Sequence, residues 1–196
     1  MVMKNPSLLL FLQLEEVLAL GGVTQRQQVE QTVCAIARGD SNWRDHHALW
    51  SRLFEPESVL QLKSLHAQFQ PQYCLTSGWT GFMDKATTLI VLRLAGLAFV
   101  ASNLHADWAI DRVPKGAARR SEEVAQWLLA NSAYQHKWVL VDSDVCDPAI
   151  QDWPEELQAY SVFCCTNAGL TGFEAGELRK NFLRRLCANP ASVQVA

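Results

Sequence analysis

Apolar residues in this chain gather in short continuous runs that alternate with longer stretches of helical periodicity. The clearest run, Leu8–Leu14, follows Pro6 and predicts a strand that is buried on both faces. A weaker pattern over Leu97–Val100 indicates a further strand. The other predicted strands are Tyr73–Thr76, Trp138–Val141 and Ser161–Cys165.

The stretches between these runs predict helices. Pro56 begins the best-defined helix, Glu57 lies in its first turn, and Pro71 ends it. The segment Trp43–Phe54 is rich in aromatic residues and has no clear periodicity. Further helices are predicted over Thr24–Arg38, Asp84–Ala95, Ser121–Asn131 and Gly176–Cys187. Strands that alternate with helices favour an α/β fold with a mainly parallel sheet.

Length and composition set the scale of the molecule. With 196 residues, the chain is long enough for one sizeable core and short for two full domains. It carries no internal repeat and no linker, so we expect a single domain over residues 1–196. The 49% of hydrophobic and 19% of charged residues are typical of a globular protein. A net charge of −3 disfavours a generally basic nucleic-acid binder, although a local basic groove stays open.

The cysteines and the apolar segments indicate in which cellular compartment we expect the protein. Six cysteines show no Cys-x-x-Cys pairing, and those in apolar runs behave as small buried hydrophobes, which favours a reduced, cytoplasmic setting. The apolar stretch Thr87–Ala101 contains Arg93 and is shorter than the roughly 20 residues that span a bilayer. Polar residues interrupt the N-terminal patch, which lacks a signal-peptide cleavage site. We therefore expect no membrane segment.

Polar residues follow the predicted strands at the edge where an open α/β sheet binds its ligands. Gln13 and Glu15 come at the end of the first strand, and Thr76 and Ser77 at the end of the second. Lys115 precedes a predicted helix, and Asp142 and Asp144 follow the strand that begins at Trp138. Each of these has a simpler interpretation: polar strand ends, a solvated loop lysine and turn-forming aspartates.

The order of these positions resembles the four motifs of the haloacid dehalogenase-like (HAD) superfamily, from about Leu8 to Thr171. Within it, the chain is most similar to the small HAD domains of Swiss-Army-Knife RNA repair proteins. The matching pieces are Phe54-Glu55-Pro56, Leu75-Thr76-Ser77-Gly78-Trp79, Trp138-Val139-Leu140-Val141-Asp142-Ser143-Asp144 and Gly169-Leu170-Thr171. The resemblance implies a Rossmannoid α/β domain, with at most a small helical cap at about residues 21–54.

The resemblance also implies roles for the polar residues. Gln13 stands at the position of the nucleophilic aspartate and Glu15 at that of the general acid and base. Thr76 or Ser77, together with Lys115, would hold phosphoryl oxygens. In the superfamily Mg²⁺ is bound by the first motif and by the acids of the fourth, here Asp142 and Asp144.

This chain departs from the HAD pattern at the position of the nucleophile. The neutral amide of Gln13 cannot form an acyl phosphate, and its carbonyl is a poorer ligand than a carboxylate for a hard cation. Ser143 replaces an aspartate of the usual pair, and Glu15 is one methylene longer than aspartate. The sequence therefore predicts a HAD-like pseudoenzyme that regulates or inhibits another protein, with no cofactor, or Mg²⁺ if residual activity remains.

Two other functions stay open. One is an unconventional Mg²⁺-dependent phosphohydrolase or nucleic-acid end-processing phosphatase, in which Glu15 or Asp144 replaces the missing aspartate. The other is nucleic-acid binding through a basic C-terminal helix, whose face is otherwise solvated. The basic residues of that helix are Arg179, Lys180, Arg184 and Arg185.

Overall fold

The computed structural model describes residues 8–110, 120–143 and 152–187, and these contain a five-stranded parallel sheet in the order β3-β2-β1-β4-β5. The strands are β1 (Leu9–Leu12), β2 (Gln72–Leu75), β3 (Leu104–Ala109), β4 (Trp138–Ser143) and β5 (Ser161–Cys164). The α-helices are α1 (Gly22–Arg38), α2 (His47–Trp50), α3 (Pro56–Phe69), α4 (Lys85–Leu94), α5 (Ala98–Ala101), α6 (Arg120–Ala130), α7 (Glu155–Ala159) and α8 (Gly172–Cys187). Short 3₁₀ helices are η1 (Trp43–His46), η2 (Gly78–Gly81) and η3 (Ser132–Tyr134).

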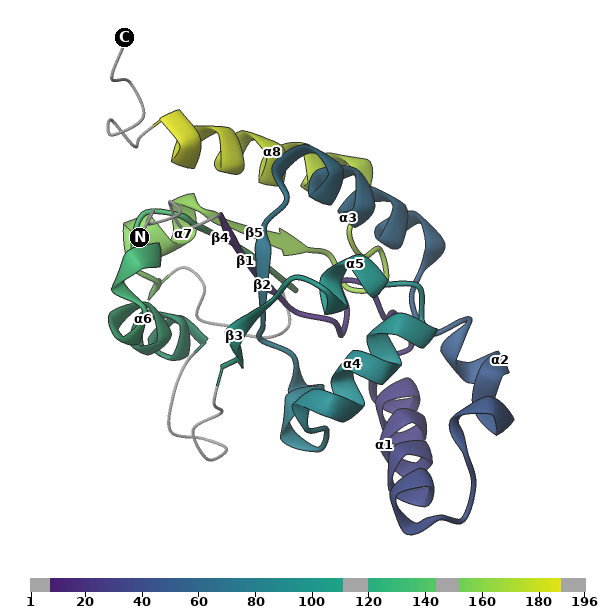
Figure 1. The fold of residues 1–196 in the computed structure, drawn as a ribbon. Helices are drawn as coiled ribbons and strands as arrows, with labels where there is room; N and C mark the ends of the chain where they lie inside the picture. Colours follow the sequence, from purple (N-terminus) through teal and green to yellow (C-terminus); the bar gives the residue numbers. More distant parts are fainter. Residues whose placement is uncertain (1–7, 111–119, 144–151, 188–196) are drawn as a thin grey trace, which may run out of the picture.

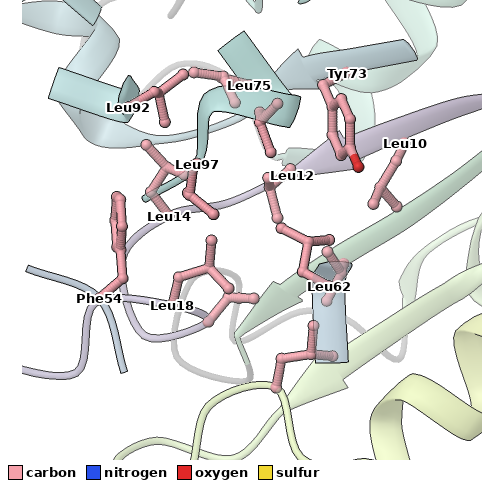
Figure 2. Close-up of a cluster of buried hydrophobic side chains, with 14 of the residues drawn as sticks. Leu10, Leu12, Leu14, Leu18, Phe54, Leu62, Tyr73, Leu75, Leu92 and Leu97 are labelled. Carbon is pink, nitrogen blue, oxygen red and sulfur yellow. The ribbon is translucent and has the colours of Figure 1, made fainter. Parts of the chain in front are cut away.

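The central strand β1 separates two hydrophobic layers, because successive side chains of a strand point to opposite faces. Leu10 and Leu12 pack in one layer with Leu62 of α3 and Leu92 of α4 (Figure 2), and buried residues of α8 belong to the same layer. Leu9 and Phe11 pack in the other with residues of α6 and α7. Figure 1 shows α3 and α8 side by side on one side of the sheet, and α6 and α7 on the other. The predicted α/β fold with a parallel sheet is confirmed.

Helix α3 follows the sequence signals closely. Glu55 has an extended backbone, Pro56 is in the first turn, and the helix ends at Gln70 in a left-handed conformation. Its buried side chains include Leu62 and Leu65, which face the larger hydrophobic layer. Proline fits the first turn because its missing N–H would have no partner within the helix there.

The prediction of a strand over Leu97–Val100 is wrong. Residues Ala98–Ala101 form the short helix α5, and the third strand of the sheet is Leu104–Ala109 instead. Leu97 and Val100 are fully buried beside Leu92 in the larger layer. A short apolar run fits a buried helical turn as well as a buried strand, so periodicity cannot separate the two.

Helix α8 begins earlier than the predicted Gly176. It starts at Gly172, and Thr171 and Glu174 form hydrogen bonds across its first turn. The backbone N–H of Thr171 donates to Glu174 Oε2 (3.1 Å), and the N–H of Phe173 donates to Thr171 Oγ1 (3.2 Å). A threonine followed three residues later by a glutamate is a capping-box signal, which the sequence carries.

The segment between β1 and α3 is mostly helical, as predicted for residues 21–54. It contains α1, η1 and α2, and Figure 1 shows α1 and α2 near α4. Gln25 Nε2 donates to the carbonyl of Leu53 (2.9 Å), which ties α1 to the end of this segment. Val29 and Trp50 are buried in the larger hydrophobic layer, so the segment packs on the main core.

Candidate functional site

Three neighbouring strands deliver their terminal polar residues to one edge of the sheet. Gln13 follows β1, Thr76 follows β2, and Asp142 lies near the end of β4. The N–H of Gln13 donates to the carbonyl of Val141 (3.1 Å), and the N–H of Thr76 donates to the carbonyl of Leu12 (3.0 Å). Because β1 lies between β2 and β4, the structure brings these sequence-predicted positions together.

Gln13 lies at the tip of the central strand and is 3% exposed. Its side-chain amide is neutral, so it lacks the negatively charged oxygen that would attack phosphorus. Thr76 and Asp142 on the neighbouring strands are each 1% exposed. The edge is thus closely packed around a residue that cannot act as a nucleophile.

A tight turn after β1 sets the position of Glu15. The N–H groups of Leu18 and Ala19 donate to the carbonyl of Leu14 (3.0 and 2.8 Å), and Glu16 adopts a φ of +60°. From the far end of the chain, the N–H of Leu170 donates to the carbonyl of Val17 (2.9 Å). The turn is therefore held on its own backbone and by the loop that precedes α8.

The loop before α8 approaches this turn closely at Gly169, which has a φ of +69°. A Cβ atom at this position would lie 2.8 Å from Ser58 Oγ and 2.9 Å from the carbonyl oxygen of Val17. Both the left-handed conformation and the lack of space require glycine here. The structure thus explains why the Gly169-Leu170-Thr171 piece begins with glycine.

The carboxylate of Glu15 is bound by residues of the Leu75-Thr76-Ser77-Gly78-Trp79 piece, which corresponds to the second of the four HAD motifs. Ser77 Oγ donates to Glu15 Oε2, and the N–H of Gly78 donates to the same oxygen (3.1 Å). Ser77 is fully buried, and its Oγ also accepts from the N–H of Trp79 (3.2 Å), which fixes the hydroxyl. The Ser77 hydroxyl, to which the resemblance assigns a phosphoryl oxygen, therefore donates to a carboxylate of the chain itself, together with the backbone N–H of Gly78.

Thr76, the other hydroxyl of the second motif, is placed differently. Its Oγ1 is buried and has no hydrogen-bond partner among the residues that the structure describes. The indole of Trp79 stacks on Phe54, with ring centroids 6.0 Å apart. This contact joins the Phe-x-Pro piece to the second motif, although the two lie far apart in the sequence.

On the other side of β1, Asp142 forms a buried ion pair with Arg120. Arg120 Nε donates to Asp142 Oδ2 (3.1 Å), and Arg120 Nη1 donates to Glu123 Oε2 (2.7 Å). The three side chains are 7%, 1% and 9% exposed for Arg120, Asp142 and Glu123. The N–H of Ser143 donates to Asp142 Oδ1 (2.8 Å), so both carboxylate oxygens accept hydrogen bonds.

Sequence reasoning missed Arg120 and chose Lys115. A helix that leads into a parallel strand runs opposite to it, so its first turn lies at the carboxyl edge of the sheet. Arg120 begins α6, which leads into β4, and this position was the available signal. Lys115 and Asp144 lie outside the described residues, so their predicted roles stay predictions.

The described residues do not fit the Mg²⁺ that the resemblance implies. Mg²⁺ prefers charged oxygen ligands. Gln13 offers an amide, and both oxygens of Asp142 already accept hydrogen bonds, one of them from a guanidinium. Within residues 8–110, 120–143 and 152–187, no group of three or more His, Cys, Asp or Glu side chains is arranged to hold a metal ion.

The basic residues of α8 do not share one face. Arg185 is 3% exposed, and its guanidinium lies 3.3 Å from the ring centroid of Tyr160. Arg179 Nε donates to Gln68 Oε1 (2.8 Å), and Lys180 Nζ donates to Glu177 Oε1 (2.6 Å). Arg184 remains exposed. The exposed basic surface of this helix is therefore smaller than the sequence predicts.

The parallel sheet and the polar positions at its carboxyl edge define a HAD-like Rossmannoid domain. A family model described as "HAD domain in Swiss Army Knife RNA repair proteins" matches residues 9–175, so the chain belongs to this family. No curated protein and no solved structure matches the chain. Among the described residues, no helix is long and apolar enough to cross a membrane.

Proposed function

We propose that this protein is a catalytically impaired HAD-domain protein that regulates or inhibits another protein. The observation that carries the proposal is Gln13 at the tip of the central strand, the position at which the resemblance to HAD proteins leads us to expect the nucleophile. Covalent catalysis at this position needs an ionised oxygen that can attack phosphorus. A carboxamide lacks that charge, so the usual first step has no attacking group.

The contacts of Glu15 support an impairment beyond the nucleophile. Ser77 Oγ and the N–H of Gly78 already donate to its carboxylate. A phosphoryl group would have to take both donors from Glu15 and would then lie beside a second negative charge. The negative charges of the phosphoryl group and of the Glu15 carboxylate would repel each other, and the repulsion is strong where water is excluded.

Exposed apolar side chains support a protein partner. Phe173 on α8 is 74% exposed and Leu129 on α6 is 73% exposed. Contiguous apolar patches mark surfaces that bind other proteins, whereas single exposed apolar side chains are common on any protein. The basic surface is limited, because Arg185 is buried and Lys180 pairs with Glu177. These features favour a protein over a nucleic acid.

The cellular setting belongs to the same proposal. Cys74 is a buried free thiol, and burial raises its pKa well above its ordinary value. A thiol that stays protonated is a poor nucleophile for disulfide exchange. Free cysteines of this kind support a reduced compartment such as the cytoplasm.

The first experiment measures phosphate release from generic phosphomonoesters in the presence of Mg²⁺. We expect no turnover above that of the Asp142→Asn variant. Turnover at the level of active HAD phosphatases that is lost in Asp142→Asn would overturn the proposal.

The variant Gln13→Asp tells how far the impairment extends. It restores a carboxylate at the nucleophile position while Glu15 keeps its bonds to Ser77 and Gly78. We therefore expect no gain of activity from this single change. A gain would show that the remainder of the site is intact and that Gln13 alone silences it.

A second candidate function is a phosphohydrolase that processes nucleic-acid ends. The family description, which names RNA repair proteins, favours it. In this case Glu15 or Asp144 would replace the missing aspartate. Phosphate release from an oligoribonucleotide with a terminal phosphate tests it, because activity that is lost in Glu15→Gln would support this function against the first.

A further inference from the structure

The carboxyl edge of the sheet contains a positive charge that belongs to the protein. Arg120, the first residue of α6, contacts Asp142 on β4 and Glu123 one turn further along its own helix. We infer that Arg120 is the resident cation of this site, and that its guanidinium gives Asp142 the countercharge that a divalent metal ion would otherwise provide. The inference rests on the proposed function, since it concerns the same impaired site.

Burial is the first argument. Asp142 is 1% exposed, and a carboxylate removed from water in this way requires a partner of opposite charge. Arg120 Nε is 3.1 Å from Asp142 Oδ2, which is hydrogen-bonding distance. The ionised state of Asp142 is therefore compensated within the chain, without any ion from solution.

The position of Arg120 is fixed on its other side. Arg120 Nη1 donates to Glu123 Oε2 (2.7 Å), three residues further along α6. A planar guanidinium that bonds two carboxylates through different nitrogens has little freedom to rotate away. Moving it aside for a metal ion would separate a buried cation from two carboxylates.

Charge at the neighbouring positions gives the third argument. Divalent cations bind most tightly where several anionic oxygens converge. Gln13 adds no charge, and Glu15 is directed to Ser77 and Gly78 on the β2 side of the site. From these described residues, a divalent ion at Asp142 would thus meet the carboxylate of Asp142 itself and a guanidinium that repels the ion. We expect the wild-type site to be indifferent to Mg²⁺ and Mn²⁺.

The test is direct binding of Mn²⁺ to the full chain, followed by electron paramagnetic resonance. Wild type should show no binding that depends on Asp142. Arg120→Gln keeps a hydrogen-bond donor but removes the charge, and it should bind Mn²⁺ about tenfold or more tightly than wild type. Adding Asp142→Asn to this variant should abolish the gain.

Glu123→Gln is the matched control, because it removes the other carboxylate partner of Arg120 and leaves the guanidinium beside Asp142. It should not gain Mn²⁺ binding. Binding of Mn²⁺ to wild type that Asp142→Asn removes would overturn the inference. An Arg120→Gln variant that folds and gains no binding would also overturn it.

A measurement that does not need Arg120→Gln keeps the inference testable if that variant does not fold. The melting temperature of wild type should be the same in MgCl2 and in NaCl of equal ionic strength. A rise specific to Mg²⁺ that disappears in Asp142→Asn would overturn the inference.

These results are separable from those on the proposed function. Phosphate release in the presence of EDTA would contradict the proposed function and leave Arg120 as the resident cation. Mn²⁺ binding at Asp142 without phosphate release would contradict the role of Arg120 and leave the proposed function standing.

Discussion

The two ends of strand β4 each hold a buried arginine, but the surroundings of the two differ. At the first residue of the strand, Arg185 Nε donates to the carbonyl of Trp138 (3.0 Å), and the guanidinium lies against the rings of Trp138 and Tyr160. Its acidic partner Glu156 has a side chain that is 57% exposed. At the other end, Arg120 contacts two carboxylates that are themselves buried.

The comparison separates a structural arginine from one that sets the charge of a site. Arg185 joins α8 to the sheet through a carbonyl and aromatic rings, which tolerate a guanidinium well. If Arg185 is removed, Glu156 returns to water at little cost. If Arg120 is removed, Asp142 stays buried and loses its guanidinium partner. Replacing each arginine should therefore have different consequences.

Arg120→Met should give the largest loss of stability. Breaking a buried ion pair by removing one partner typically costs about 3–5 kcal/mol, because the other charge remains buried. Unfolding by urea at neutral pH measures the loss. The double variant Arg120→Met with Asp142→Asn should recover most of it, and failure to recover would mean that packing, not charge, holds this end of β4.

Arg185→Met should cost less, about 2 kcal/mol, for the lost cation–π contact and the lost hydrogen bond to Trp138. The same urea experiment measures it. Because Glu156 is largely exposed, adding Glu156→Gln should not rescue the variant. A loss as large as that of Arg120→Met, or a rescue by Glu156→Gln, would remove the distinction between the two ends.

Neutral hydroxyl groups extend the comparison from β4 to strands β2 and β5. Ser77 at the carboxyl edge donates to the carboxylate of Glu15, whereas Ser161 at the start of β5 donates to the carbonyl of Leu157 (2.6 Å). Hydrogen bonds to a charged acceptor are stronger, so Ser77→Ala should cost about 1.5–3 kcal/mol and Ser161→Ala about 0.5–1.5 kcal/mol. Equal losses of stability in the two variants, measured by urea unfolding, would contradict the view that Ser77 donates to a charged carboxylate of Glu15.

The smallest expected effect is a pH dependence at the amino end of β2. His66 Nδ1 lies 3.0 Å from the hydroxyl of Tyr73, and burial lowers the pKa of His66 below its usual value of 6.5. At pH values around the pKa of His66 in the folded and unfolded states, the unfolded chain therefore binds more protons than the folded one. This contribution to stability is present above pH 6.5 and is lost as the pH falls through the lowered value.

Urea unfolding of wild type and His66→Gln over that pH range measures the effect. The slope of stability with pH should be smaller in the variant. The contribution of Asp84, whose pKa is lowered by hydrogen bonds from Thr87, is lost only at more acidic pH, below its usual 3.8, and does not overlap with this range. An unchanged slope in His66→Gln would exclude a role for this histidine.

The sequence predicts the inner strands of the sheet better than its edge. Strands β1, β2 and β4 are buried on both faces, so each is a continuous apolar run that stands out from its surroundings. The edge strand β3 is Leu-His-Ala-Asp-Trp-Ala and is partly exposed, so it has no such run. The fully apolar Leu97–Val100 nearby gave a stronger pattern and led to the wrong assignment.

The candidate site is predictable in part for a related reason. Gln13, Ser77 and Asp142 each follow or end an apolar strand, and a parallel sheet brings such ends together. The ion pair of Arg120 with Asp142 and the bond of Ser77 to Glu15 are tertiary contacts between distant segments, 22 and 62 residues apart. No local pattern encodes them, and the roles of Lys115 and Asp144 stay predictions.

The contact of Leu170 with Val17 has a consequence for how this domain is made. It joins the turn that presents Glu15, near the start of the chain, to a loop that precedes the last helix. Contacts of such long sequence separation form late, because a long loop must close first. During synthesis, the turn that presents Glu15 therefore reaches its final geometry only after Leu170 has left the ribosome.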